Sequence, residues 1–275
     1  MRVLSRLVND WLPPVINRSL RKFVGGGGRV SFEGPFCSWA EAVQRSSGYD
    51  SQEILEKVLA ATLKVKNGEA ACERDSVLFQ EVQYSFPVTA ALMWAAARNR
   101  GHLSVLDFGG SLGSCYFQNK EFLKELVKLQ WSVIEQPHFV EAGRKYVQSE
   151  QIKFYGNISE CLESEDPNII LLSGVLQYLE DPAQALKEIL AIGAEIIVID
   201  LTIVNSGFSD ILWIQRIPSN IYSAKYPAWS LSKKILNQSL TNSNYQLVSE
   251  FKTLEFPALV EIKSEFKGLL YKRNC

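Results

Sequence analysis

Closely spaced glycines follow an aspartate in the middle of the chain, and they could bind a nucleotide-like ligand. In the segment LDFGGSLGS, Asp107 precedes Gly109, Gly110 and Gly113. Glycine lets the backbone approach a ligand closely, and the N-terminus of a following helix presents unpaired N–H groups to an anion. The alternative is a tight strand-to-helix turn that needs glycine for its geometry alone. We predict a ligand-binding loop here.

A second carboxylate, Glu135, ends the next predicted strand in the segment WSVIEQP. A carboxylate at this place can accept hydrogen bonds from both hydroxyls of a ribose. Taken alone, Glu135 would equally suit a solvated strand end. The glycine loop and the strand–helix alternation around it favour the ribose contact.

The order of these residues, D-x-G-G-x-x-G, differs from the dehydrogenase pattern G-x-G-x-x-G. It resembles motif I of class I S-adenosylmethionine-dependent methyltransferases, and the resemblance implies S-adenosylmethionine as cofactor. It further implies that residues after the third strand frame the adenine and that the tip of the fourth strand lies beside the transferred methyl group. The expected cofactor-binding residues are Asp107, Gly109, Gly110, Ser111, Gly113, Glu135, Gln136, Asn157, Ile158 and Ser173.

Longer segments resemble a family of methyltransferases found among bacterial surface-polysaccharide genes. They include VLDFGGSLGSCYFQ, WSVIEQPHFVEAG and IQRIPSNIYSAKYPAWSLS, and the resemblance runs from about Phe32 to the C-terminus. It implies a class I fold, S-adenosylmethionine as methyl donor and a sugar or other glycan precursor as acceptor. One position departs from the family, because Leu201 follows Asp200 where an arginine is expected.

Methyl transfer to a hydroxyl requires positioning, exclusion of water and removal of a proton, and it needs no metal. Ligands of such sheets bind outside the carboxyl ends of the strands, which favours Asp200 and His138 as candidate bases, with Glu81 as a third. For His138 the alternative is a solvent-facing residue at a helix N-terminus. The chain has two histidines, and its five cysteines are scattered, so we expect free thiols and no metal site.

Aromatic and polar residues near the strand ends are candidates for binding the acceptor. A proline-bearing loop is expected over residues 221–230, where aromatic faces could stack on a sugar ring or could instead anchor the loop to the core. The sequence lacks the D/N-P-P-Y/F signature of enzymes that methylate planar nitrogen, which argues against nucleobase or amide targets. We expect an oxygen acceptor, and the alternative is a nitrogen or carbon acceptor. The expected acceptor residues are Glu81, Tyr84, Gln177, Tyr178, Tyr222, Tyr226 and Trp229.

The elements that must position these residues change in character along the chain. Residues 32–100 follow a mostly helical period, whereas short β-branched runs alternate with amphipathic segments after Gly101. Two long strands without a helix between them end the chain. The pattern predicts an α/β Rossmann-like methyltransferase fold, with a mostly parallel seven-stranded sheet and an antiparallel last strand. The expected divisions are a basic segment with a glycine linker (1–28), a helical lead-in or lid (29–100) and the methyltransferase domain (101–275).

The overall composition excludes several classes of function. With 29 basic and 30 acidic residues in 275, the chain has no global field to attract nucleic acid. No stretch approaches the ~18 apolar residues of a membrane span, so we expect a cytoplasmic protein. The basic segment 1–23 would pack on the domain as a short helix, or else lie on a membrane surface. A non-catalytic scaffold that docks on a membrane glycan assembly is the alternative to an enzyme.

Overall fold

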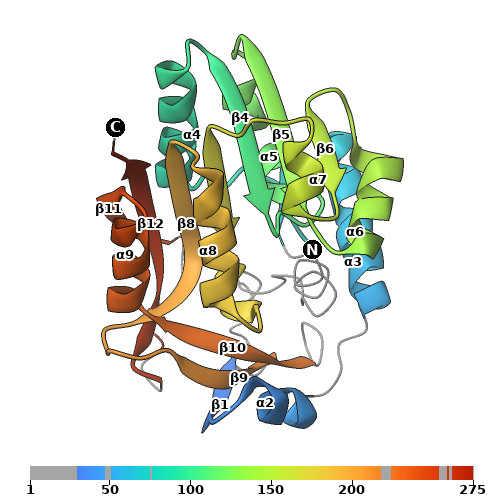
Figure 1. Ribbon diagram of the computed structural model, residues 1–275. Helices are drawn as coiled ribbons and strands as arrows, with labels where there is room; N and C mark the ends of the chain where they lie inside the picture. The colour runs from blue at the N-terminus through green and yellow to red at the C-terminus, as the bar shows by residue number, and fades with distance from the viewer. Residues whose placement is uncertain are drawn as a thin grey trace.

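The computed structural model describes residues 30–46, 51–74, 76–217, 224–253, 259 and 262–274 (Figure 1). At its centre lies a sheet in which parallel strands alternate with helices along the chain. Seven strands form this central part. In order across the sheet they are β6 (Ile152–Tyr155), β5 (Lys128–Ile134), β4 (His102–Phe108), β7 (Ile169–Ser173), β8 (Ile196–Asn205), β12 (Ser264–Arg273) and β11 (Tyr245–Lys252).

The antiparallel end of the sheet is as predicted. β12 pairs antiparallel with β8, with Leu270 opposite Val198, and it pairs antiparallel with β11 on its other side. The strands from β6 to β8 are parallel to their neighbours. The Rossmann-like α/β methyltransferase fold and the antiparallel last strand are therefore confirmed.

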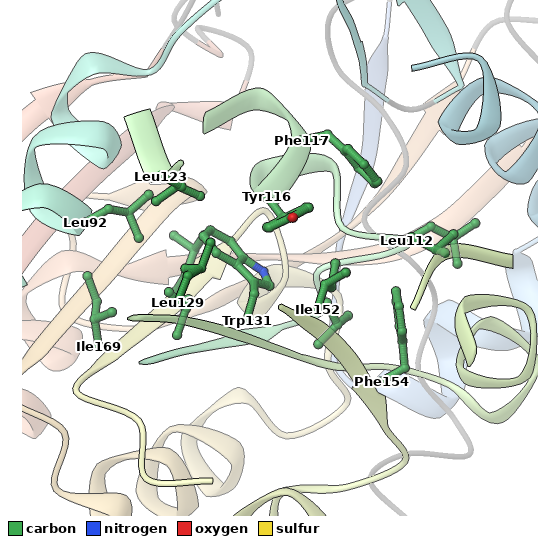
Figure 2. Close-up of a cluster of buried hydrophobic side chains, with 14 of the residues drawn as sticks. Leu92, Leu112, Tyr116, Phe117, Leu123, Leu129, Trp131, Ile152, Phe154 and Ile169 are labelled. Atoms are coloured by element: carbon green, nitrogen blue, oxygen red, sulfur yellow. The ribbon is translucent and has the colours of Figure 1, made fainter. Parts of the chain in front are cut away.

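Both faces of the sheet are covered, which explains why its strands are apolar runs rather than alternating ones. Successive residues of β7 point to opposite sides: Ile169 and Leu171 belong to one core cluster, and Ile170 and Leu172 to the other. Trp131 is fully buried in the first cluster, and Figure 2 shows it among leucine and isoleucine side chains. The covering helices are α3 (Ser51–Lys66), α4 (Phe86–Arg98), α5 (Ser114–Leu123), α6 (Pro137–Ala142), α7 (Ile158–Leu162), α8 (Pro182–Ile192) and α9 (Lys233–Asn242).

The sheet continues beyond the seven predicted strands. β9 (Ile211–Ile217) and β10 (Ala224–Ser232) form an antiparallel pair, and β1 (Ser31–Phe36) extends it, so that the sheet has ten strands. Figure 1 shows this extension, with α2 (Trp39–Arg45), on the side toward which β4 points. It therefore lies at the edge of the sheet where ligands of such folds bind.

The predicted loop at 221–230 is wrong over its described part, because residues 224–232 form β10. Pro227 suggested a loop, since proline cannot donate a ladder hydrogen bond. The strand tolerates it because β10 pairs with β8 only through Leu231 and Ser232, so one edge carries no ladder at Pro227.

The region before β4 is helical only in part. Helices α2, α3 and α4 agree with the helical period, but that period missed β1 and the hairpin of β2 (Cys72–Arg74) and β3 (Val77–Phe79). These strands are short, and β1 pairs with a strand far along the chain, so local periodicity carries little signal for them. Segment 1–28 lies outside the described residues. Within the described part of the chain, no helix is long and apolar enough to cross a membrane.

Candidate functional site

The glycine loop connects the carboxyl end of β4 to the N-terminus of α5. Gly109 and Gly113 have φ of 77° and 88°, and Ser111 between them has φ of 54°. A Cβ atom on Gly110 would lie 2.4 Å from Oδ2 of Asp107, and one on Gly113 would lie 2.5 Å from Cδ1 of Ile152. Because neighbouring atoms lie so close to these two glycines, no other residue type fits at Gly110 or Gly113 without displacing them.

Asp107 is buried beneath the loop. Its side chain is 1% exposed and accepts a hydrogen bond of 2.9 Å from Nε1 of Trp131. Burial raises the pKa of Asp107 to about 7, although the bond from Trp131 acts in the opposite direction. Asp107 is thus a partly protonated acid near neutral pH, held against the loop backbone.

Glu135, at the end of β5, is joined to the loop by its own hydrogen bonds. Its side chain is 0% exposed, and its two oxygens accept from the backbone N–H of Ser111 at 3.0 Å and of Gln136 at 2.9 Å. Burial raises the pKa of Glu135 to about 8 against the effect of these two bonds, and the charge of Asp107 raises it further. The structure therefore shows Glu135 shaping the loop, and its contact with a ribose stays a prediction.

Two polar atoms beside Glu135 are buried without a hydrogen-bond partner in the structure: Nε2 of Gln136 and Nε2 of His138. Buried side-chain nitrogens are nearly always hydrogen-bonded, so atoms left without a partner are expected where a ligand binds. Burial also lowers the pKa of His138, which favours the neutral imidazole. A neutral imidazole can accept a proton, as the predicted role of a base requires.

The predicted adenine residues follow β6. Oδ1 of Asn157 accepts a hydrogen bond of 2.9 Å from the backbone of Glu160 and caps α7, and Ile158 packs partly buried against the core. A cavity of about 520 Å³ borders this region and has Pro137 and Gly156 in its wall. These are the chain neighbours of Gln136 and Asn157, but none of the predicted cofactor-binding residues lines the cavity, so the position of the adenine stays a prediction.

Asp200 lies beside Ser173 but not at the end of a strand. The two residues are register partners of β7 and β8, at the point where β7 ends. β8, however, continues to Asn205, which corrects the expected strand end at Asp200. Leu201, where the resemblance to the family leads to an arginine being expected, has a left-handed φ of 51°. It lies between the part of β8 that pairs with β7 and the part that pairs with β10.

Three of the predicted acceptor residues lie in a buried environment beside the β9–β10 extension. The hydroxyl of Tyr178 donates to Oε1 of Gln215 at 3.1 Å. The ring of Tyr178 packs edge-on against that of Tyr226, with centroids 5.4 Å apart. Gln177 donates from Nε2 to the carbonyl of Leu201 at 3.0 Å. Tyr178, Gln177 and Tyr226 are all buried against the extension.

Trp229 is an aromatic anchor of the core. Its Nε1 donates to the carbonyl of Leu179 at 3.1 Å, and its ring stacks on Trp39 at 6.2 Å. This agrees with the core alternative for the aromatic segment. Tyr222 lies outside the described residues.

Glu81 and Tyr84 are not brought to the glycine loop. Glu81 is exposed, and Tyr84 packs edge-on against Phe122 with centroids 5.1 Å apart. Phe122 is near the C-terminal end of α5, whereas the loop is at its N-terminal end. At ~1.5 Å per residue the two places are about 12 Å apart along the helix.

The hairpin residues Glu73 and Arg74 were not among the residues predicted from the sequence. The hydroxyl of Ser114, in the first turn of α5, donates to Oε1 of Glu73, and the backbone N–H of Ser76 donates to Oε2 at 3.3 Å. Glu73 is buried, which raises its pKa. A signal was present, because the charged run ERDS between short apolar runs is typical of a hairpin turn.

Comparisons with known proteins give structural neighbours but no sequence relatives. No protein-family model matches the sequence, and no curated protein does. Resemblance to the methyltransferases of surface-polysaccharide genes is therefore not shown and stays a prediction.

The structure is similar to that of the 1,6-didemethyltoxoflavin-N1-methyltransferase of Burkholderia thailandensis with bound 1,6-didemethyltoxoflavin and S-adenosylhomocysteine: TM-score 0.40, 13% identity, covering 84% of this chain and 99% of that one. It is also similar to magnesium protoporphyrin IX methyltransferase of Synechocystis PCC 6803 with bound S-adenosylmethionine: TM-score 0.44, 10% identity, covering 83% and 99%. A third neighbour is the N-terminal domain of EvdMO1 in the presence of S-adenosylhomocysteine and D-fucose: TM-score 0.45, 13% identity, covering 82% and 98%.

Proposed function

We propose that this chain is an S-adenosylmethionine-dependent methyltransferase whose acceptor is a hydroxyl of a sugar or glycan precursor. The observation that carries the proposal is the glycine loop at the end of β4, held between the buried carboxylates of Asp107 and Glu135. The resemblance of the sequence to a methyltransferase family supports the sugar acceptor. The proposed protein acts in the cytoplasm on a small molecule and not on nucleic acid.

The residues present fit this cofactor. S-adenosylmethionine carries two positive charges, on its sulfonium and its ammonium group, and Asp107, Glu135 and Asp200 supply buried carboxyl groups around the loop. The nitrogens of Gln136 and His138 that lack partners supply donors or acceptors beside the end of β5. When bound, the cofactor supplies an activated methyl group with a neutral thioether as leaving group.

The tasks of the protein's own residues follow from this. The loop and Glu135 position the donor, and the β9–β10 extension covers the sheet edge and excludes water from it. His138 and Asp200 are the candidates for taking the hydroxyl proton. Of the two, His138 has the clearer geometry for a base, because its Nε2 is buried without a partner and its pKa is lowered.

Two alternatives to an enzyme that methylates a hydroxyl remain open. A nitrogen or carbon acceptor would use the same cofactor site. A non-catalytic scaffold would keep the fold and dock through segment 1–23 on a membrane-bound glycan assembly, and the replacement of the family arginine by Leu201 favours this view.

Calorimetric titration of the purified chain with S-adenosylmethionine, S-adenosylhomocysteine and a nicotinamide dinucleotide tests the proposal. Micromolar binding of the first two without binding of the third is expected, and a screen of nucleotide sugars and glycan lipids for methyl acceptance then follows. Absence of binding by either adenosyl compound would contradict the proposal. Binding without transfer to any hydroxyl, amine or carbon acceptor would favour the scaffold.

A further inference from the structure

Arg74 is a cation in a group of buried acids, and the predicted sites did not include it. It is the last residue of β2, next to Glu73, which is tied to the first turn of α5 by the hydroxyl of Ser114. This hydrogen bond places the hairpin against the same helix N-terminus that ends the glycine loop. Arg74 is thus held at the loop by backbone and side-chain contacts of its neighbours.

The thiol of Cys115, the second residue of α5, marks where these side chains meet. It is half-buried. Burial raises its pKa, as do the charges of Asp107 and Asp200, whereas the charge of Arg74 and a hydrogen bond with Ser173 lower the pKa. These residues come from β4, β8, β2 and β7 in turn. The cluster therefore lies at the carboxyl ends of the central strands, beside the glycine loop.

The guanidinium of Arg74 is incompletely paired in this cluster. Its Nη1 is buried and has no hydrogen-bond partner in the structure. A buried cationic nitrogen without a partner is costly, and an anionic group that accepts its hydrogen bonds removes the cost. Arginine presents a planar fork that matches a carboxylate in two-point geometry.

Carboxyl groups and one guanidinium around a single point complement a zwitterion. An α-amino acid carries an ammonium group and a carboxylate a few ångströms apart, and the proposed cofactor ends in such a group. We propose that Arg74 binds the α-carboxylate of the methionine portion of S-adenosylmethionine. This inference rests on the proposed function and makes Arg74 a residue that positions the cofactor.

The test compares two ligands that differ in this carboxylate. S-adenosylmethionine and decarboxylated S-adenosylmethionine are titrated into the wild-type chain, Arg74→Gln and Arg100→Gln. The last is a matched control, because Arg100 is exposed and precedes the opposite end of β4. The wild-type chain is expected to prefer S-adenosylmethionine by about 10- to 100-fold, the range of a charge-assisted hydrogen bond.

Arg74→Gln should remove this preference, because it lowers only the affinity for the ligand that bears the carboxylate. Arg100→Gln should retain the preference. Thermal unfolding without ligand should be unchanged or slightly raised by Arg74→Gln, since the variant removes an unpaired buried charge. If Arg74→Gln does not fold, Arg74→Lys keeps the charge without the fork and should lose most of the preference.

Other outcomes overturn the inference. If Arg74→Gln lowered the affinity for both ligands equally, Arg74 would have a structural role only. If the affinity for both were unchanged, the carboxylate would bind elsewhere. A wild-type chain that binds both ligands equally would overturn the assignment of Arg74 while leaving the proposed function standing. A wild-type chain that binds neither would overturn the proposed function and this inference with it.

Discussion

Glu135 stabilises the glycine loop and is also predicted to contact the ligand. Its carboxylate accepts two backbone N–H groups while fully buried. A substitution there changes the loop itself as well as any ligand contact. Effects on binding can therefore be interpreted only together with effects on stability.

Glu135→Ala should destabilise the fold and weaken cofactor binding. Loss of the carboxylate leaves the N–H groups of Ser111 and Gln136 buried without acceptors, at a cost of about 1–3 kcal/mol each. Urea denaturation and calorimetric titration measure the two effects. The exposed Glu125→Ala, in the turn that follows α5, serves as control. Unchanged stability and affinity would remove Glu135 from the site.

Asp107 and Glu135 should make the stability of the ligand-free protein depend on pH. Burial raises their pKa values to about 7 and about 8, so the folded state holds protons that the unfolded state releases. Their stabilising contribution is complete below about pH 4 and is lost as the pH rises through 7 and 8. Denaturant unfolding from pH 5 to 9 measures this. Glu135→Gln should flatten the upper part of the decline, and a decline identical to that of the wild type would contradict the assignment.

Cofactor binding should strengthen over the same pH range. A cationic ligand favours the ionised carboxylates, so binding near neutral pH should release protons and the Kd should fall between pH 6 and 8.5. Titrations in buffers of different ionisation enthalpy count these protons. A Kd independent of pH, with no proton release, would place both acids away from the bound cation.

The turn from β4 to α5 has no room for a larger side chain at Gly110, because the carboxylate of Asp107 lies close to its backbone. Gly110→Ala would place a Cβ atom 2.4 Å from the carboxylate of Asp107. We expect a loss of about 1–3 kcal/mol in the free energy of unfolding and a strong loss of cofactor affinity, because overpacking displaces Asp107.

Gly68→Ala provides the matched control for the loop variant. Gly68 also has a left-handed backbone, with φ of 80°, but no atom lies within 4 Å of the position that a Cβ atom would take there. The variant should cost stability through backbone strain alone and retain cofactor affinity. Thermal unfolding and calorimetry on both variants provide the comparison. Normal binding by Gly110→Ala would mean that the loop is a turn and nothing more.

Across the described part of the chain, the contacts reported for the site residues lie within residues 39–229. Deletion of residues 1–28 should therefore leave cofactor affinity unchanged. Flotation with anionic liposomes tests the alternative in which segment 1–23 lies on a membrane surface. That alternative requires the full-length chain to float and the deleted chain to stay behind. Equal flotation of the two would end the membrane proposal, and lost cofactor binding in the deleted chain would show that this segment contributes to the site.

Local patterns in the amino-acid sequence were enough to predict the central fold and the glycine loop. The order of Asp107 and the glycines, the strand–helix alternation and the two long strands at the C-terminus carried these predictions, because backbone geometry and two-sided burial act over short stretches. Glu135 could be placed at a strand end for the same reason.

Contacts between distant parts of the chain set the remaining features, and these appear only in the folded structure. They bring the short hairpin that contains Arg74 to the first turn of α5, and they place Trp229 against Trp39 in the core instead of in a loop. β8 also continues past Leu201 to pair with β10, a strand that the local period does not reveal. Each of these outcomes depends on partners more than 30 residues away or on the pairing of short strands, and chain-local propensities do not encode such pairing.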